Sequence, residues 1–575
     1  MFHLHQRDPS LSGFGRRLLA LIPGMVVVVL GTSGSPAQDS PAEGETPAPS
    51  GANATESTGE KPFYIRHYKV KGASKLKRID IEKAVYPFMG PACTTQHVEQ
   101  ARASLEKAYR EVGYSLVTVV VPPQEAKFGV ITLEVAENRI GRLRVNGARY
   151  FLPEDIKRRV PSLAEGTVVN FEKVKEEIIA LNRHPDRQVL IGESKAGAIP
   201  GTLDIDLNVK DKSSLHGSLE LNNRYSPDTT ELRINGSLNY TNLWQAGHTL
   251  GFNFQVAPER PEDASVFSGF YMLPITPTTS FMLTGTKQDS NINTLGGSSV
   301  GGKGYVLGAR VNFTLPNGPP FSSKPTYFHS LSLGVDFKHF DEDVTFAGVT
   351  QQTPIEYYPF SVNYGGTWVA KNHSTDVNAT TTYGIRGPGS DSNEFDAKRF
   401  LADGSFFHVR GDLAHTHDLP GGMEIFAKVQ GQLASQPLIN SEQASGGGIG
   451  NARGYLESTV LGDNAIFGSV ELRSPSLINR RQAAPGRETK PDPDAPPESK
   501  DEWRFYLFAD AGHLTLNEPL PEQDDQFSLV SIGAGSRISY KDHFHASVDA
   551  GLPLRDAGIV EEGDWLVTFR LWTDF

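Results

Sequence analysis

The chain has 575 residues, enough for two to four domains of ordinary size. Hydrophobic residues make up 38% of it and glycine is plentiful, with 57 residues, while a charged fraction of 21% and 9% aromatic residues disfavour global disorder. The formal net charge of −12 argues against a general nucleic-acid binder. A single cysteine, Cys93, excludes an internal disulfide or a cysteine-rich metal site.

Residues 1–37 read as a secretory signal peptide. Arg16 and Arg17 precede an apolar run, and small residues up to Ala37 offer a cleavage site. The run is short for a helix that crosses a bilayer, so a membrane anchor is the weaker alternative. Residues 38–61, rich in Pro, Ser, Gly and Thr, are predicted to form a flexible linker.

Two similar units are predicted at 62–137 and 138–211. In each, a strand precedes a helix whose apolar residues recur every three or four positions, and two more strands follow. The predicted elements are strands 63–70, 115–121 and 130–135 with a helix from Thr94 or Thr95 to Gly113, and strands 140–145, 188–192 and 203–209 with a helix at 171–181. A β-α-α-β-β order that occurs twice indicates two small α/β domains in tandem.

After residue 212 the helical period gives way to alternating apolar and polar residues. Sixteen strands are predicted, at 215–224, 230–240, 249–257, 265–273, 279–287, 304–315, 327–339, 355–366, 374–385, 404–414, 422–433, 459–473, 503–515, 526–539, 542–551 and 564–575. Such alternation suits either a soluble sandwich or a barrel with a wet lumen. The signal peptide, the many long strands and a last strand that reaches the last residue favour a 16-stranded antiparallel transmembrane β-barrel over 212–575.

No catalytic, cofactor or metal site is predicted. The run from Gly297 to Gly304 is similar to the sequence motif of a phosphate-binding loop. It lacks the Ser or Thr that would hold magnesium, and a predicted strand follows it instead of a helix. The 16 histidines show no metal-ligand spacing, and no Gly-x-Ser-x-Gly elbow is present. We therefore expect a protein that is not an enzyme.

Two segments carry opposite charges that would form an ion pair in the barrel lumen only if a loop folded inward. Residues 445–455 are rich in glycine and contain Arg453, in the loop between predicted strands 11 and 12. Glycines let a backbone enter a confined space, and a guanidinium can present a planar fork to a carboxylate. On predicted strand 13, Asp510 shares a face with Phe508, while Trp503 and its alternating neighbours form the lipid face. A flexible surface loop with an incidental arginine is the alternative.

These motifs, taken together and in order, resemble a known family. They are Leu181-Asn182-Arg183, Ala452-Arg453-Gly454-Tyr455, Gly462-Asp463, Glu471-Leu472-Arg473 and Phe508-x-Asp510-x-Gly512. With the tandem units and sixteen strands, the chain resembles the two-partner secretion (TpsB-type) transporters, relatives of the haemolysin and filamentous-haemagglutinin exporters. These transporters belong to the outer-membrane assembly superfamily, and their tandem units are POTRA domains.

The resemblance implies roles for particular residues. It implies that a loop motif, Arg453, Gly454 and Tyr455, is tucked into the lumen and held by the strand motif Phe508, Asp510 and Gly512. It also implies that the cell's barrel-insertion machinery reads a C-terminal signature formed by Phe575, Trp565 and Phe569.

Two segments depart from the family pattern. Residues 476–502 are a Pro- and charge-rich insertion where the family has a short turn. Residues 38–61 show no amphipathic pattern, which argues against a plug helix.

The function expected from the resemblance is export of one dedicated, largely unfolded exoprotein through an outer-membrane pore. POTRA domains in the periplasm would capture it by adding a strand to a sheet edge, with 130–135 and 203–209 as candidate strands, although the sequence does not show which strand forms an edge. The alternative is that these units merely brace the barrel. The expected partners are a large β-helical exoprotein, the barrel-insertion machinery and outer-membrane lipid, with a monomeric transporter and no cofactor or nucleic acid. A barrel-assembly factor of the same superfamily and a passive porin are the alternatives, and the cargo remains open.

Overall fold

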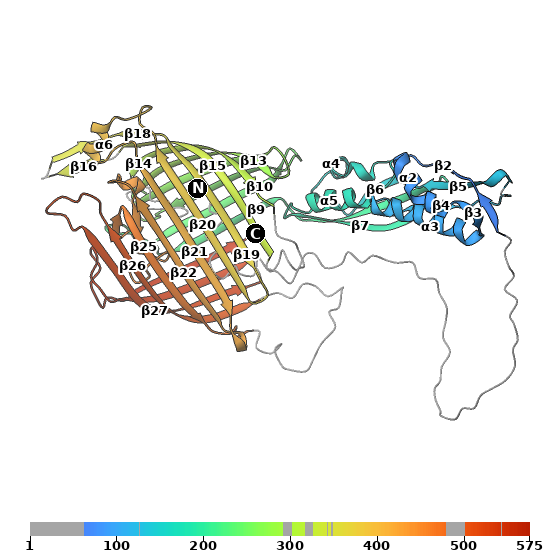
Figure 1. Cartoon of the computed structure of the whole chain (residues 1–575). Helices are drawn as coiled ribbons and strands as arrows, with labels where there is room; N and C mark the ends of the chain where they lie inside the picture. Colours follow the sequence, from blue (N-terminus) through green and yellow to red (C-terminus); the bar gives the residue numbers. More distant parts are fainter. Residues whose placement is uncertain are drawn as a thin grey trace, which may run out of the picture. The chain divides into compact units, whose positions relative to one another are not determined.

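The computed structural model describes residues 62–125, 127–290, 302–316, 326–341, 343–346, 349–478, 501–541 and 543–575. The predicted signal peptide and linker, and most of the insertion at 476–502, lie outside these ranges. The chain divides into two compact units: an α/β unit up to Ser213, and a unit built of strands from Ser214 to the C-terminus (Figure 1). Among the described residues, no helix is both long enough and apolar enough to cross a bilayer.

The α/β unit contains two three-stranded sheets of the same topology. In each sheet the last strand is central, parallel to the first strand and antiparallel to the other. The elements of the first sheet are β2(His67–Lys71), α2(Arg78–Val85), α3(Thr95–Glu111), β4(Val117–Val120) and β5(Val130–Glu137). Those of the second are β6(Arg139–Asn146), α4(Pro153–Arg158), α5(Phe171–Leu181), β7(Arg187–Ala196) and β8(Thr202–Asp211). The predicted β-α-α-β-β repeat is confirmed.

Two details of the predicted strands differ from the structure. The segment 63–70 forms β1(Phe63–Ile65), which pairs with β3(Gly90–Cys93), and then β2, which pairs with β5. Both segments named as candidates for capturing an extended chain are central strands, β5 and β8, so their backbone groups already pair on two sides. That expectation was wrong, because strand order within a sheet depends on tertiary pairing. The sheet edges are β2 and β4 in the first sheet, and β6 and β7 in the second.

In each sheet, a carboxylate at the end of the central strand accepts hydrogen bonds from a nearby loop, an arrangement called the carboxylate clamp below. In the first, Glu137 at the end of β5 accepts hydrogen bonds from the amides of Ser74 and Lys75, at 2.6 and 2.9 Å, and from the Tyr109 hydroxyl at 2.9 Å. In the second, Asp211 at the end of β8 accepts from three successive amides, Arg149 to Phe151, at 2.8 to 3.1 Å. Each clamp orders the loop between the first strand and the first helix.

Replacement of Glu137 by glutamine is expected to destabilise the first sheet by about 1–3 kcal/mol, because several donors lose a charged acceptor. Burial by itself raises the pKa of Glu137, but hydrogen bonds from Ser74, Lys75 and Tyr109 outweigh it and lower the pKa. The clamp therefore stabilises the fold above the carboxyl's unfolded pKa, and the contribution is lost as pH falls through the lower folded value. Amide exchange of β5 in the full chain measures both effects. Glu134→Gln, an exposed change on the same strand, is the control and should leave exchange unchanged.

Sixteen strands form a closed antiparallel barrel, as predicted (Figure 1). They are β9(Leu215–Asn222), β10(Arg233–Leu243), β11(His248–Val256), β12(Ala264–Pro274), β13(Thr279–Ser290), β14(Gly302–Thr314), β15(Thr326–Asp341), β19(Pro359–Val369), β20(His373–Gly384), β21(Phe407–Asp418), β22(Glu424–Ala434), β25(Asn464–Arg473), β26(Glu502–Thr515), β27(Gln526–Tyr540), β28(Phe544–Pro553) and β29(Leu566–Asp574). The short β18(Ile355–Tyr357) also pairs with β15, just before β19. Gly302 to Gly304, from the near phosphate-loop motif, lie in β14.

Alternation along each strand separates an apolar outer face from a polar lumen. On β26, Phe505 and Leu507 are exposed on the outside, whereas Tyr506, Phe508 and Asp510 are buried. Since an outer apolar band is what lipid requires, the pattern that predicted the strands also orients them.

Candidate functional site

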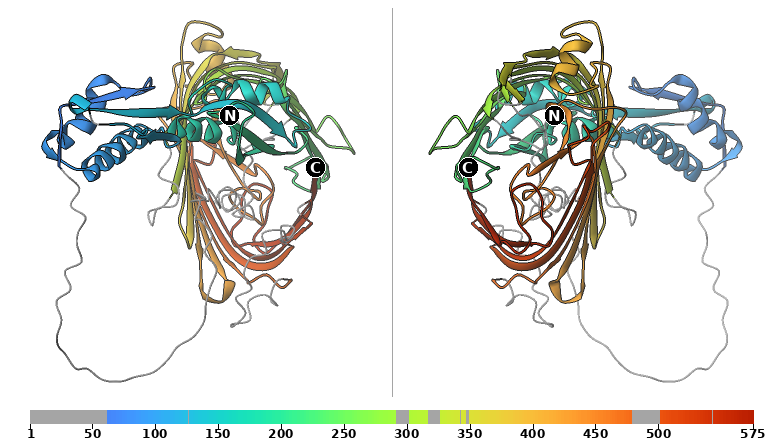
Figure 2. Two further views of the ribbon diagram at one scale, coloured as in Figure 1. Left: turned by 90° about the vertical axis from the view of Figure 1, so that its right-hand side faces the viewer. Right: turned by 90° about the vertical axis from the view of Figure 1, so that its left-hand side faces the viewer.

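The loop between the eleventh and twelfth barrel strands, β22 and β25, folds back into the barrel. Two short strands within it, β23(Ala444–Gly446) and β24(Val460–Gly462), pair with each other, so residues 447–459 form the tip of a hairpin. The tip turns at Gly447, Gly448 and Gly454, whose φ angles of +107°, +90° and +93° suit glycine. In the views along the barrel, orange segments lie inside the ring of strands (Figure 2).

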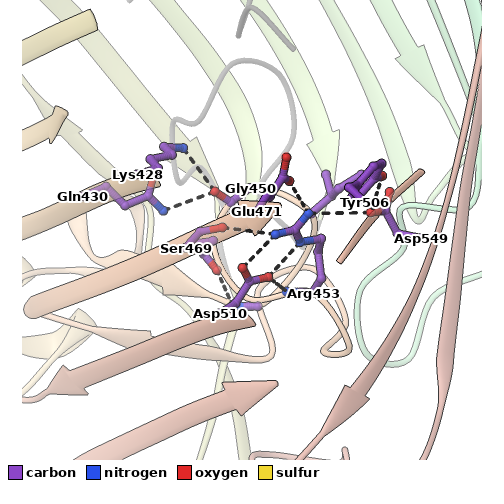
Figure 3. A network of polar contacts seen from close by, with 12 residues as sticks. Lys428, Gln430, Gly450, Arg453, Ser469, Glu471, Tyr506, Asp510 and Asp549 are labelled. Carbon is purple, nitrogen blue, oxygen red and sulfur yellow. Dashed lines mark hydrogen bonds and ion pairs between the residues drawn. The ribbon is translucent and has the colours of Figure 1, made fainter. Parts of the chain in front are cut away.

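Arg453 at this tip is surrounded by acceptors from the barrel wall (Figure 3). Its Nε and one terminal nitrogen donate to the two oxygens of Asp510, each at 2.8 Å, and its backbone amide donates to Asp510 Oδ2 at 3.0 Å. The other terminal nitrogen donates to Glu471 Oε1 at 2.5 Å. Only 5% of Arg453 is exposed. A planar fork held by two carboxylates is the strongest kind of polar contact that the loop can make.

The charges around Arg453 continue beyond these two carboxylates. Asp549 Oδ1 on β28 lies 3.7 Å from the guanidinium, and Glu471 is also paired with Arg473 and Arg537. The guanidinium carbon lies 3.7 Å from the centre of the Phe508 ring, a cation–π geometry. The arginine therefore balances a buried acidic patch made by β25, β26 and β28.

Gly454 and Tyr455 bring the loop against the next strands of the wall. A Cβ on Gly551 of β28 would lie only 2.5 Å from the Gly454 amide nitrogen, so Gly551 leaves room for the loop, while Gly454 is favoured by its positive φ. The Tyr455 hydroxyl lies 2.8 Å from the carbonyl oxygen of Arg555 and accepts from the Val530 amide at 3.2 Å. The Tyr455 ring is 1% exposed.

Gly512 acts indirectly on the loop. A Cβ there would lie 2.4 Å from the Phe467 ring on the neighbouring strand. That ring packs in a buried apolar cluster with Ala452 and Tyr455 of the loop. In the predicted strand motif, Phe508 thus supplies a ring face for Arg453, Asp510 supplies a carboxylate, and Gly512 leaves space for the Phe467 ring.

The residues of the predicted C-terminal signature are spread along the last strand, and Trp565 lines a pocket together with Gly454 and Leu456 of the Arg453 loop. Phe575 exchanges two backbone hydrogen bonds with Gly217 of β9, at 3.0 and 3.1 Å, and its ring covers Gly217. Trp565, which precedes β29, is 63% exposed, and Phe569 is partly exposed on the outer face.

Sequence reasoning missed the residue that holds the base of the loop. Asp463 is fully buried and accepts from both terminal nitrogens of Arg399, at 2.6 and 2.7 Å, and from the Leu438 and Asn517 amides, at 3.0 and 2.7 Å. It thereby joins the loops that follow β20 and β26 to the Arg453 loop. The sequence showed Asp463 only as part of a motif, because its partners are up to 64 residues away.

A second buried carboxylate, Glu442, lies in the same loop. It accepts from Lys338 Nζ at 2.5 Å and from the Tyr357 hydroxyl at 2.8 Å, and lies 3.1 Å from His408 Nε2. This role is not visible in the sequence, because an isolated glutamate in a polar loop belongs to no recognisable motif. Within the described residues no group of three or more His, Cys, Asp or Glu could hold a metal ion.

Family models match both parts of the chain. Residues 63–138 match the POTRA domain of ShlB type, and residues 201–538, more than half of the chain, match the haemolysin secretion/activation protein family ShlB/FhaC/HecB.

The chain belongs to the ShlB/FhaC/HecB family. It is thus an outer-membrane transporter of the two-partner secretion class.

Curated relatives agree with this family. An outer membrane transporter CdiB of Dickeya dadantii is 21% identical over 440 residues, 71% of this chain and 72% of the relative. A heme/hemopexin transporter protein HuxB of Haemophilus influenzae is 20% identical over 404 residues, 67% of each chain.

Solved structures share the fold of this family member. CdiB from Escherichia coli has a TM-score of 0.56 at 19% identity and covers 91% of this chain and 93% of its own. CdiB from Acinetobacter baumannii has a TM-score of 0.51 at 15% identity and covers 99% and 97%. BamA from Haemophilus ducreyi lacking POTRA domains 1–3 has a TM-score of 0.50 at 14% identity and covers 89% and 100%.

Proposed function

We propose that this transporter exports one dedicated exoprotein in an extended state and that the Arg453 loop closes its lumen between transport events. Under this proposal the domains at 62–137 and 138–211 lie in the periplasm and bind the exoprotein, and residues 212–575 form the pore. The transporter acts as a monomer, and the barrel-insertion machinery reads its C-terminal signature at Phe575, Trp565 and Phe569.

The observation that carries this proposal is the way the loop is held. Its tip is bound to the wall by hydrogen bonds and ion pairs from Arg453 and by a small buried cluster that includes Ala452 and Tyr455. Such contacts can break and re-form as a unit, since the loop is a hairpin with its own internal pairing. A loop built this way can leave the lumen without unfolding the barrel.

The α/β unit offers a sheet edge to an extended chain beyond Val189, whose amide and carbonyl already pair with the Asn182 side chain at 2.6 and 2.9 Å. β7 is a ten-residue edge strand that pairs only with β8 in its sheet. Leu190 and Ile191 on it are 44% and 37% exposed. An incoming segment could add a strand at this edge, with main-chain hydrogen bonds for affinity and the two apolar side chains for selectivity.

A binding measurement with the purified full chain tests this proposal. The probe is the N-terminal region of the large exoprotein encoded beside the transporter, compared with unfolded precursors of unrelated outer-membrane barrels. Saturable binding to the exoprotein segment alone supports dedicated export. Equal binding to all precursors would favour a barrel-assembly factor, and no binding to any would contradict recognition by the α/β unit.

A further inference from the structure

The barrel closes through an unusually short seam. β29 and β9 are registered over five residue pairs, from Ser218 and Asp574 to Asn222 and Arg570. The other neighbouring barrel strands that the structure describes are registered over eight to fourteen pairs. At its beginning, β29 therefore extends past the end of β9.

Just past the end of β9, Asn223 binds β29 with both its backbone and its side chain, and its amide donates to the Phe569 carbonyl oxygen at 3.4 Å. The Phe569 amide donates to Asn223 Oδ1 at 2.7 Å, and Asn223 Nδ2 donates to the Val567 carbonyl oxygen at 2.8 Å. One side-chain amide thus pairs with two backbone groups of β29, as a strand residue would. The other part of the seam is held by the ion pair between Arg570 and Glu220, at 2.9 and 3.0 Å.

The two residues after Asn223 are bound to the Arg453 loop. Arg224 Nε donates to Glu457 Oε1 at 2.7 Å, and the Glu457 amide donates to the Tyr225 carbonyl oxygen at 3.0 Å. The side chains of Arg224 and Glu457 are 26% and 16% exposed, so this pair is not a fully solvated surface ion pair. A Cβ on Gly448 would lie 2.2 Å from the carboxylate, so glycine there makes room for Glu457.

We infer that Glu457 is a positioning residue that couples the loop to the barrel seam, an inference that rests on the proposed movement of the Arg453 loop. When the loop leaves the lumen, Glu457 releases Arg224 and Tyr225. Asn223 then loses its fixed position, and the start of β29 separates from β9. The Phe575 end of the seam stays closed, because the Arg570–Glu220 ion pair and the backbone bonds between Phe575 and Gly217 hold it.

Amide hydrogen exchange in the full chain, purified in detergent micelles, tests the coupling. Glu457→Gln keeps the shape of the side chain and removes its charge. It is expected to accelerate exchange of the Phe569 amide at least tenfold, and Arg224→Gln should do the same. The double variant should be no faster than either single one, since both break the same contact. Amides of β20 and β21, which lie away from the seam, should exchange as in the unchanged protein.

Two further variants make the result decisive. Asn223→Ala removes the acceptor of the Phe569 amide directly and should accelerate its exchange. Glu562→Gln removes an exposed charge from the loop before β29 and should have no effect. Unchanged Phe569 exchange in Glu457→Gln, with acceleration in Asn223→Ala, would overturn the coupling. Unchanged exchange in Asn223→Ala would overturn the role of Asn223. Failure of the export proposal would instead leave the exchange results intact and appear as normal secretion by Arg453→Ala.

Discussion

Replacing Arg453 with alanine is expected to lower secretion of the exoprotein at least tenfold while the barrel still folds and inserts. The change removes the arginine that pairs with Asp510 and faces Asp549, while Glu471 keeps Arg473 and Arg537 as partners. Removing one partner of a buried ion pair costs about 3–5 kcal/mol, enough to displace the loop from its seat. The barrel itself is held by backbone pairing between strands, which the substitution does not touch. The measurement is exoprotein in the medium relative to heat-modifiable, folded transporter in the outer membrane.

Two further variants distinguish the effect of the positive charge of Arg453 from the effect of its two-pronged contact with Asp510. Arg453→Lys keeps the positive charge but cannot form the two-pronged contact with Asp510 or lie flat over Phe508, so intermediate secretion is expected. Asp510→Ala removes the carboxylate that accepts three of the hydrogen bonds and should resemble Arg453→Ala. Normal secretion by both alanine variants would refute a role for this contact in export.

Gly551→Val is expected to displace the loop without removing any charge. The added Cβ would lie 2.5 Å from the Gly454 nitrogen, and the backbone at that point cannot rotate away as a flexible side chain could. The loop should move away from β28 and expose Arg453, which is 5% exposed in the structure. Trypsin cleavage after Arg453 in the purified protein measures this exposure, and we expect it to rise from near zero to most of the molecules.

Gly468→Val is the matched control for this prediction. Gly468 lies on β25, and an added Cβ there meets no atom within 4 Å. Trypsin should leave Arg453 of this variant intact. If trypsin does not cleave Gly551→Val after Arg453, the loop accommodates the valine side chain. Close contact with β28 would then not be what holds the loop in place.

Much of the architecture could be predicted from local patterns. A strand with one apolar and one polar face shows a period of two, and a helix on a sheet shows a period of 3.6, so both are visible without knowledge of their partners. This is why all sixteen barrel strands and the tandem α/β units were found. The expectation of Arg453 and Asp510 as a lumenal pair, drawn from those faces and the family motifs, agrees with their observed distance of 2.8 Å.

Other features depend on pairing between distant segments. The order of strands in the two small sheets, which placed β5 and β8 in the centre, is a choice among pairings that the alternation of side chains does not distinguish. Asp463 was visible as a motif residue, but not its partners Arg399 and Asn517, which lie in other loops.

The strands, the faces they present and the residues of the Arg453 loop motif are visible in local patterns, because each follows from periodicity or from the chemistry of a short motif. The identity of the groups that meet depends on how distant segments pack. The closing seam brings Asn223 to Phe569, which is 346 positions away, and the loop carries Glu457 to Arg224. Contacts of that kind form only when the barrel closes, and a local pattern of apolar and polar residues does not predict them.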